Sequence, residues 1–233
     1  MNDPKITILI CTFNGARTIA AAIESALAQK TQIPFEVFVV DDGSTDETAG
    51  IVRHMSEHDQ RIWMKHLPRN SGLPLACNDG VKFSDGDYFI RLDDDDLLHP
   101  DALESLCPML NAGLADCSYC DRLSIDTETG VRRHITVGPA IGPGWLSRLS
   151  ACGVMMRRDL FLELGGYSDL FWSEYDLYLR YLAKAKNPIH YIGRSLYICA
   201  ARPGGDNEKT LEGWKELAGL WGDEKLREHG LGI

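Results

Sequence analysis

The chain has 233 residues, of which 44% are hydrophobic and 25% are charged, and its formal net charge is −10. This length and composition suit a soluble globular protein with a full hydrophobic core. The negative charge argues against general binding to nucleic acid or to an anionic membrane, and no apolar run approaches the ~18 residues of a membrane-spanning helix.

The first 110 residues alternate between strand and helix patterns. Apolar strand patterns lie at 6–10, 35–40, 62–67 and 88–92, and helical patterns lie at 16–29, 44–58, 71–84 and from 99. Such alternation with short links predicts βαβ crossovers and a mostly parallel sheet with helices on both faces.

Side-chain spacing indicates where two of these helices begin and which side chains face the core. Ser44 and Glu47 have capping-box spacing, so the second helix is expected to begin there. In the third helix, Pro74 belongs in the first turn, and Leu73 and Val81 are expected to face inward.

The second half is less regular. Strands joined by a turn at 128–130 are followed by a Gly- and Pro-rich loop at 138–146 and by a strand and short helix ending at Gly165. A helix at 173–185, with Leu179 and Leu182 toward the core, a strand at 189–200 and an amphipathic helix at 209–229 complete the chain.

Seven cysteines, an odd number, lie mostly in apolar contexts. Reduced, buried thiols in a cytoplasmic protein fit this pattern best. Cys117 and Cys120 have the spacing of half a zinc site, but no second pair follows, and alternation along a strand aims them at opposite faces.

Two acidic clusters follow predicted strands. Asp41 and Asp42 come after the second strand, and Asp93 to Asp96 come after the fourth. The carboxyl ends of parallel strands are where such sheets bind ligands. Asp93 and Asp95, one residue apart, suit a hard cation such as Mg²⁺ or Mn²⁺ that recruits a phosphate. The alternative is a solvated charge run at the surface.

Four segments together resemble family 2 glycosyltransferases of the GT-A fold. They are "ITILICTFNG", "FEVFVVDDGSTD", "YFIRLDDDDLLHPDAL" and "GGYSDLFWSEYDLYLR", in the order in which the family has them. The resemblance implies one GT-A domain over 1–233, with a nucleotide-binding half to about 110, an acceptor-binding half over about 111–205 and a helical tail over 206–233. It implies inverting transfer from a UDP- or dTDP-sugar to an acceptor hydroxyl, assisted by Mg²⁺ or Mn²⁺.

By the same resemblance, several residues are assigned to the nucleotide. The nucleotide-binding set is Thr12, Phe13, Asn14, Asp42, Asn70, Asp93, Asp94 and Arg202. Asp42 is expected to accept the uracil N3–H, although capping of the following helix is its alternative role. Asp95 is expected to contact the metal directly, with Asp93 beside it, and Asp96 to cap the next helix. Arg91 is expected to lie at the surface or behind the site.

The resemblance places the catalytic base in "SEYDLYLR". Glu174 takes the base position, and Asp176 is the competing candidate. The alternative role of Asp176 is to place a negative charge at the N-terminus of the helix, which complements the helix dipole. Arg202 stands where many relatives have a histidine. An arginine cannot bind a metal but can clamp phosphate, so the need for the metal stays open.

The partners expected are a nucleotide-sugar donor and a saccharide or lipid-linked acceptor, and no nucleic acid. Trp145, Trp172 and Tyr175 either stack on acceptor sugars or belong to the core. Helical spacing of Trp214, Leu217 and Trp221 favours packing against the domain or a second subunit in a homodimer over peripheral attachment to the inner membrane face. A non-catalytic nucleotide-sugar binding module and a GT-A nucleotidyltransferase remain alternatives.

Overall fold

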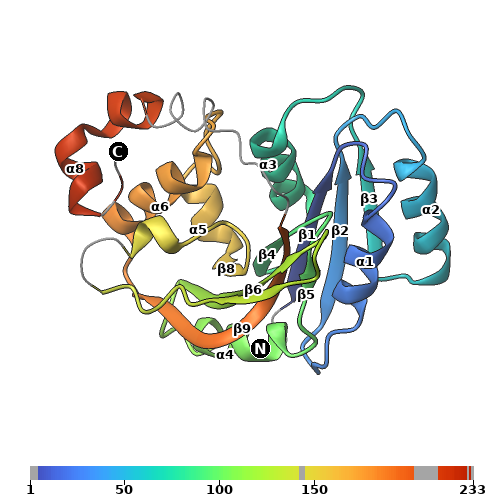
Figure 1. Ribbon diagram of the computed structural model, residues 1–233, viewed down its shortest axis with the longest axis horizontal. Coiled ribbons are helices and arrows are strands. Elements are labelled where there is room, and N and C mark those ends of the chain that lie inside the picture. The colour runs from blue at the N-terminus through green and yellow to red at the C-terminus, as the bar shows by residue number, and fades with distance from the viewer. Residues whose placement is uncertain (1–4, 142–144, 202–214, 230, 232–233) are drawn as a thin grey trace.

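A computed structural model describes residues 5–141, 145–201, 215–229 and 231. Within these residues one nine-stranded sheet has the order β3-β2-β1-β4-β8-β6-β9-β5, with β7 paired to β6 (Figure 1). The strands are β1 (Ile6–Thr12), β2 (Phe35–Asp41), β3 (Ile62–His66), β4 (Tyr88–Asp93), β5 (Leu97–Leu98), β6 (Cys117–Asp126), β7 (Arg132–Ile135), β8 (Val154–Arg157) and β9 (Ile189–Ala201).

The first half of the sheet is parallel, as predicted. β1 pairs in parallel with β2 and β4, and β2 pairs in parallel with β3. β8 then runs antiparallel to β4 and β6, while β6 and β9 form a long parallel pair. The fold is therefore mixed α/β, with a parallel first half of the sheet that continues into a second, mixed half.

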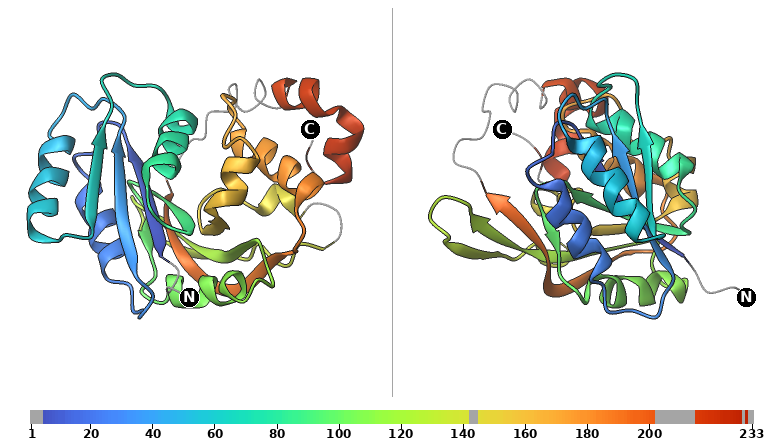
Figure 2. Two further views of the ribbon diagram at one scale, coloured as in Figure 1. Left: turned by 180° about the vertical axis from the view of Figure 1, so that it is seen from behind. Right: turned by 90° about the vertical axis from the view of Figure 1, so that its right-hand side faces the viewer.

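Helices cover both faces of the sheet (Figures 1 and 2). They are α1 (Ile19–Leu27), α2 (Thr48–His58), α3 (Leu73–Phe83), α4 (Ala102–Asn111), the 3₁₀ helix η1 (Leu146–Arg148), α5 (Arg158–Glu163), α6 (Ser173–Lys184) and α8 (Asp223–Glu228). Side chains of α3, α5 and α6 share one core, and those of α1, α2 and α4 share the other.

Strand alternation explains the two cores. In β1, Leu9 packs on the α3 side, whereas Ile8 packs on the α1 side, because successive side chains of a strand point to opposite faces. Cys117 and Cys120 of β6 divide between the two cores in the same way. All seven cysteines are free of disulfide bonds, and the burial of Cys117 and Cys120 in opposite cores agrees with the expectation that alternation aims them at opposite faces.

Three local predictions are wrong. Ser44 does not cap α2: its hydroxyl accepts the N–H of Asn14, and Asp46 accepts the Thr48 N–H at the helix start. Leu73 and Leu182 are 44% and 37% exposed instead of buried. Both lie at helix ends: Leu73 is the first residue of α3, and Leu182 is in the last turn of α6, where fewer neighbouring residues cover a side chain.

The predicted C-terminal helix is broken. Residues 215–221 are helical, but Gly222 has φ of 77°, in the left-handed region that ends a helix, and α8 follows. Leu217 is fully buried and Trp221 packs against the same core, so both contact the domain; Trp214 lies outside the described residues. Within the described part of the chain, no helix has the length and apolar character to cross a membrane.

Candidate active site

The sheet brings the predicted acidic clusters together. Thr12 of β1 pairs with Asp41 of β2, and Cys11 pairs with Asp93 of β4. The carboxyl ends of three neighbouring strands therefore meet at one edge of the sheet, which is where parallel sheets bind ligands.

A cavity of about 200 Å³ opens at this edge. Its lining residues are Cys11, Thr12, Phe13, Asp42, Asn70, Gly72, Leu73, Ala76 and Asp94. Five of them belong to the set that the sequence assigns to the nucleotide. Phe13 is 46% exposed, so this apolar ring faces solvent beside the cavity.

Asp42 shapes one wall of this cavity. Its carboxylate is buried and accepts the Ser71 N–H at 2.8 Å, the Ser71 hydroxyl at 2.7 Å and the Gly72 N–H at 2.8 Å. Two of these bonds reach Oδ1 and one reaches Oδ2. Because a carboxylate offers about four acceptor positions, Asp42 keeps one position on Oδ2.

Asn14, which the sequence assigns to the nucleotide, is not among the residues that line this cavity, and its role there stays a prediction. Its backbone has φ of 56°, its N–H donates to the Ser44 hydroxyl and its Oδ1 accepts the Thr45 N–H. Asn14 thus ties the loop after β1 to the loop after β2 and holds the cavity's rim.

The next residue, Gly15, packs closely against two side chains. A Cβ there would lie 2.2 Å from Asp94 Oδ2 and 2.3 Å from Thr12 Oγ1, well inside van der Waals contact. Thr12 Oγ1 donates a hydrogen bond to Asp94 Oδ2. Gly15 therefore makes room for a carboxylate that the DDDD segment directs toward β1.

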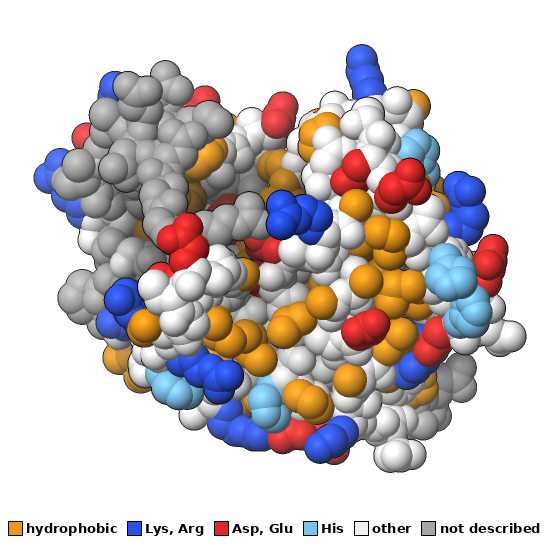
Figure 3. Space-filling view, turned by 45° about the vertical axis from the view of Figure 1, so that its right-hand side comes forward, with side chains coloured by type: hydrophobic (Ala, Val, Ile, Leu, Met, Phe, Trp, Pro, Cys, Tyr) orange, Lys and Arg blue, Asp and Glu red, His pale blue; other side chains and the backbone are white. Residues whose placement is uncertain are grey.

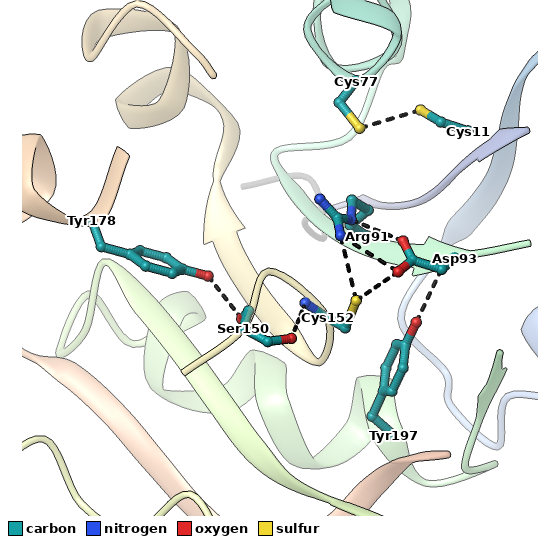
Figure 4. Close-up of polar contacts among 8 residues, drawn as sticks. All are labelled: Cys11, Cys77, Arg91, Asp93, Ser150, Cys152, Tyr178 and Tyr197. Atoms are coloured by element: carbon teal, nitrogen blue, oxygen red, sulfur yellow. Dashed lines mark hydrogen bonds and ion pairs between the residues drawn. The ribbon is translucent and has the colours of Figure 1, made fainter. Parts of the chain in front are cut away.

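Asp93 is held by a buried network (Figure 4). Arg91 Nε donates to Asp93 Oδ1 at 3.0 Å, and the Cys152 thiol donates to Oδ2 at 3.0 Å. The Asp93 N–H donates to the Tyr197 hydroxyl at 3.0 Å. Arg91 and Tyr197 are buried, so the carboxylate of Asp93 is fixed in orientation by groups behind it.

Of the two places expected for Arg91, the surface and a position behind the site, the structure shows the second. Cys152 had no predicted role. A usable signal was present for Arg91, since a charged residue inside the apolar strand "YFIRL" needs a buried partner. No pattern in the sequence indicates that Cys152, 59 positions later, reaches Asp93.

The same end of the sheet carries a group that could hold a cation. Ligand atoms of Asp93, Asp96 and Cys152 all lie within 4.8 Å of one another. Burial raises the pKa of Asp96 to about 7, with the Asp93 and Asp95 charges acting in the same direction. Asp96 accepts the Ala200 N–H and does not cap α4, which begins at Ala102.

The donor chemistry fits a hard cation. The carboxylates supply the oxygen ligands that Mg²⁺ and Mn²⁺ prefer. Such an ion would also offset the electrostatic repulsion between closely spaced carboxylates. Burial raises the pKa of the Cys152 thiol to about 12, so this group stays protonated and donates to Asp93. The predicted pair, Asp93 and Asp95, is partly exposed and remains a prediction.

Glu174 lies in the first turn of α6 and is half-buried. Burial raises the pKa of its carboxyl; the Arg91 charge opposes that shift and the Asp93 charge adds to it. Glu174 therefore lies within electrostatic reach of the Arg91–Asp93 pair.

Asp176 occupies a different environment. Its Oδ2 accepts the Ser168 hydroxyl at 2.7 Å and the Arg180 guanidinium at 2.7 Å, and its Oδ1 accepts Trp221 Nε1 at 2.8 Å. Burial acts to raise its pKa, but these hydrogen bonds together lower it. These contacts join α6 to the C-terminal segment.

The aromatic residues considered for the acceptor divide between the core and the surface. Trp145 and Tyr175 are buried, whereas Trp172 is half-buried and packs against Tyr175 with ring centroids 5.3 Å apart. Arg202 lies outside the described residues.

Comparison with known proteins decides the family. A family model described as "Glycosyl transferase family 2" matches residues 7–165. The chain belongs to this family. It is 27% identical over 239 residues to an uncharacterized protein of Sinorhizobium fredii, covering 98% of this chain and 26% of that protein. It is 35% identical over 127 residues to the chondroitin synthase of Escherichia coli, covering 54% of this chain and 18% of that protein.

Other relatives are also longer than this chain. The succinoglycan biosynthesis protein ExoO of Rhizobium meliloti is 37% identical over 125 residues, which are 53% of this chain and 35% of that protein. Among solved structures, Staphylococcus aureus TarS in complex with UDP-GlcNAc matches with a TM-score of 0.73 at 20% identity over 86% of this chain and 60% of that one. A Pyrobaculum calidifontis mannosyltransferase with GDP-Man and Mn²⁺ matches with a TM-score of 0.69 at 17% identity over 94% of this chain and 63% of that one. These structural matches establish the GT-A fold.

Proposed function

We propose that the protein is an inverting glycosyltransferase that moves a sugar from a nucleotide-diphosphate sugar to an acceptor hydroxyl in glycan or polysaccharide biosynthesis. One observation carries the proposal. The cavity at the carboxyl ends of β1, β2 and β4 is lined by Thr12, Asp42 and Asp94, and the charge of the neighbouring Asp93 acts on the carboxyl of Glu174. This supports a donor pocket with a base close to it.

The cavity suits a nucleotide. The remaining acceptor position on Asp42 Oδ2 matches the imide N3–H of uracil or thymine. Phe13 offers an exposed ring on which a base can stack, and Asn70 offers an amide to the base or ribose. UDP-GlcNAc bound to TarS agrees with a uridine donor, and so we favour a UDP- or dTDP-sugar.

A divalent cation, Mg²⁺ or Mn²⁺, is assigned to Asp93 and Asp95, with Asp94 directed to the nucleotide. When bound, the ion neutralises charge on the diphosphate leaving group. Arg91 and Cys152 hold the Asp93 carboxylate in one orientation. A carboxylate fixed in this way can bind a metal ion without first changing its conformation. The Mn²⁺ in the mannosyltransferase structure supports a metal in this fold.

Glu174 is proposed as the base that removes the proton from the acceptor hydroxyl as that hydroxyl attacks the anomeric carbon. Its raised pKa makes its carboxylate a better proton acceptor than an exposed glutamate. Asp176 was the competing candidate. Its bonds to Ser168, Arg180 and Trp221 support a positioning role, in which it fixes α6 and with it Glu174.

Donor turnover with matched variants tests this function. UDP-, dTDP- and GDP-sugars are incubated with Mn²⁺ and a saccharide panel, and release of nucleoside diphosphate is measured for wild type, Glu174→Gln and the exposed control Glu163→Gln. We expect Glu174→Gln to bind donor normally and to lose at least ~100-fold in turnover, with the control unchanged. Donor binding without turnover in wild type would instead identify a binding module.

A further inference from the structure

Two histidines share one face at the end of α2. His58 is the last residue of this helix, and His54 lies one turn earlier. Side chains four positions apart are neighbours on a helix, with Cβ atoms about 5–6 Å apart. Their ring centroids lie 4.6 Å apart, at an interplanar angle of 60°. Both residues are exposed, and Figure 3 shows two histidine side chains side by side on the surface. A dissolved ion can therefore reach both rings.

A hydrogen bond fixes the state in which His58 can bind a metal. Its Nδ1 lies 2.8 Å from the carbonyl oxygen of His54. Because a carbonyl oxygen only accepts, Nδ1 carries the proton, and Nε2 of the neutral ring keeps its lone pair. Histidines that bind metals almost always donate their other ring N–H to a carbonyl, a carboxylate or water. The ligand atom of His58 is therefore prepared before any metal binds.

The surroundings leave the imidazoles as the available ligands. Asp59 follows His58, but its carboxylate is engaged by Arg61: Oδ1 accepts Nε–H at 3.0 Å and Oδ2 accepts Nη2–H at 2.7 Å. The last turn of a helix also carries partial negative charge on its carbonyl groups, which favours a cation there. Both effects support a cation bound by the two rings.

This pair is separate from the reaction centre. α2 packs through Val52 into the core that it shares with α1 and α4, whereas α3 and α6 share the other core. Leu73 of the donor cavity and Glu174 belong to α3 and α6. The ligand chemistry differs as well, since carboxylates suit Mg²⁺ and Mn²⁺, whereas imidazole suits Zn²⁺, Ni²⁺ and Cu²⁺.

We propose that His54 and His58 form a surface site for a divalent ion of the imidazole-binding class, such as Zn²⁺. The two ring nitrogens hold the ion, and water fills its remaining positions. The spacing is that of the two zinc-binding histidines in helical H-E-x-x-H sequences; here Met55, Ser56 and Glu57 stand between the histidines. The ion joins two side chains of the last turn of α2, and the site does not depend on the proposed glycosyl transfer.

Ring-nitrogen signals in ¹H–¹⁵N spectra test the site directly. Zn²⁺ is titrated into the full chain in the presence of excess Mg²⁺, which occupies the carboxylates at the end of β4. The samples are wild type, His54→Gln and His58→Gln, which also assign the signals, and the control His134→Gln, which removes an exposed histidine of β7.

In wild type and in the control, we expect one nitrogen of each ring of the pair to shift, with saturation at equal concentrations of ion and protein. Either variant of the pair should bind Zn²⁺ at least about tenfold more weakly, since even the loss of a group that only orients a ligand costs about 10–100-fold in metal affinity.

Three results would overturn the proposal. One is the absence of a saturable shift at both rings in wild type. Another is a shift at one ring only, which shows that the histidines do not act as a pair. The third is a Zn²⁺ affinity that stays the same in both variants of the pair and falls in Asp95→Asn, which assigns the ion to β4. UDP binding is measured in the same samples, so a failed zinc site with intact UDP binding leaves the proposed glycosyl transfer standing.

Thermal unfolding gives a second readout. An ion that binds only the folded chain raises Tm, by up to about 5–10 °C at roughly 100 times its Kd for a chain of this size. The difference between wild type and His54→Gln cancels binding of Zn²⁺ to the seven cysteines of the unfolded chain. The site predicts a larger rise of Tm in wild type, and equal changes in the two proteins contradict it.

Discussion

Replacing Asp42 by asparagine should weaken the fold and donor binding together. Asp42 is 4% exposed, and its three hydrogen bonds hold the Ser71–Gly72 turn that forms one wall of the cavity. In its best orientation the asparagine oxygen keeps the two Ser71 bonds, and its NH₂ group faces the Gly72 N–H, donor against donor. The lost bond and the weaker neutral bonds should lower the free energy of unfolding by about 2–3 kcal/mol.

Thermal and urea unfolding measure this loss, and calorimetric titration measures UDP affinity. For a chain of this size each kcal/mol lowers Tm by about 2–4 °C, so we expect a fall of about 4–12 °C. UDP should bind at least tenfold more weakly, because the wall moves and the acceptor on Oδ2 is lost. Asp85→Asn, at a side chain 82% exposed, is the matched control. The reasoning fails if Asp42→Asn and the control behave alike.

Three further predictions concern the reaction centre. Glu174 acts as a base only when it is deprotonated, and its pKa is raised, so kcat/KM should fall as the pH drops through a value above the ~4.3 of an ordinary glutamate. Glu174→Gln should lack this fall on the acidic side of the pH profile. If the variant keeps the fall, Glu174 is not the base. Cys152→Ser should keep the hydrogen bond to Asp93 and a near-normal kcat/KM, whereas Cys152→Ala should lower kcat/KM about tenfold. Equal values of kcat/KM in the two variants would show that this hydrogen bond does not contribute to the reaction. Gly15→Ala should abolish measurable UDP binding while circular dichroism stays native, because its Cβ displaces Asp94; unchanged binding would show that Asp94 does not contribute.

The parallel half of the fold was predictable because its signals are local. Each strand of "ITILI", "FEVFVV" and "YFIRL" is an unbroken apolar run, and short links leave little freedom in how such strands connect. The two-residue strand β5 was not predicted, since its pairing with β9 joins positions about 100 residues apart. The break at Gly222 was missed because a glycine inside an apolar pattern fits either a helix or its end.

The site was predictable as a set of residue types, but not as a network. Strand ends placed Thr12, Asp42 and Asp94 around one cavity, as the sequence indicates. The roles of Asn14 and Asp96 depend on loop contacts with Thr45 and Ala200, which have no sequence period. Long-range contacts of this kind form only once the chain has folded, so they cannot be predicted from the spacing of residues in a single sequence.

The central claim is that a cation held at the end of β4 joins the enzyme to the donor's diphosphate. Crystals of the protein with UDP and Mn²⁺, measured at the manganese absorption edge, test it most directly. The account predicts one anomalous peak in contact with Asp95 and the diphosphate, beside Asp93, and its loss in Asp95→Asn. Bound UDP with no anomalous peak near either aspartate would contradict the account.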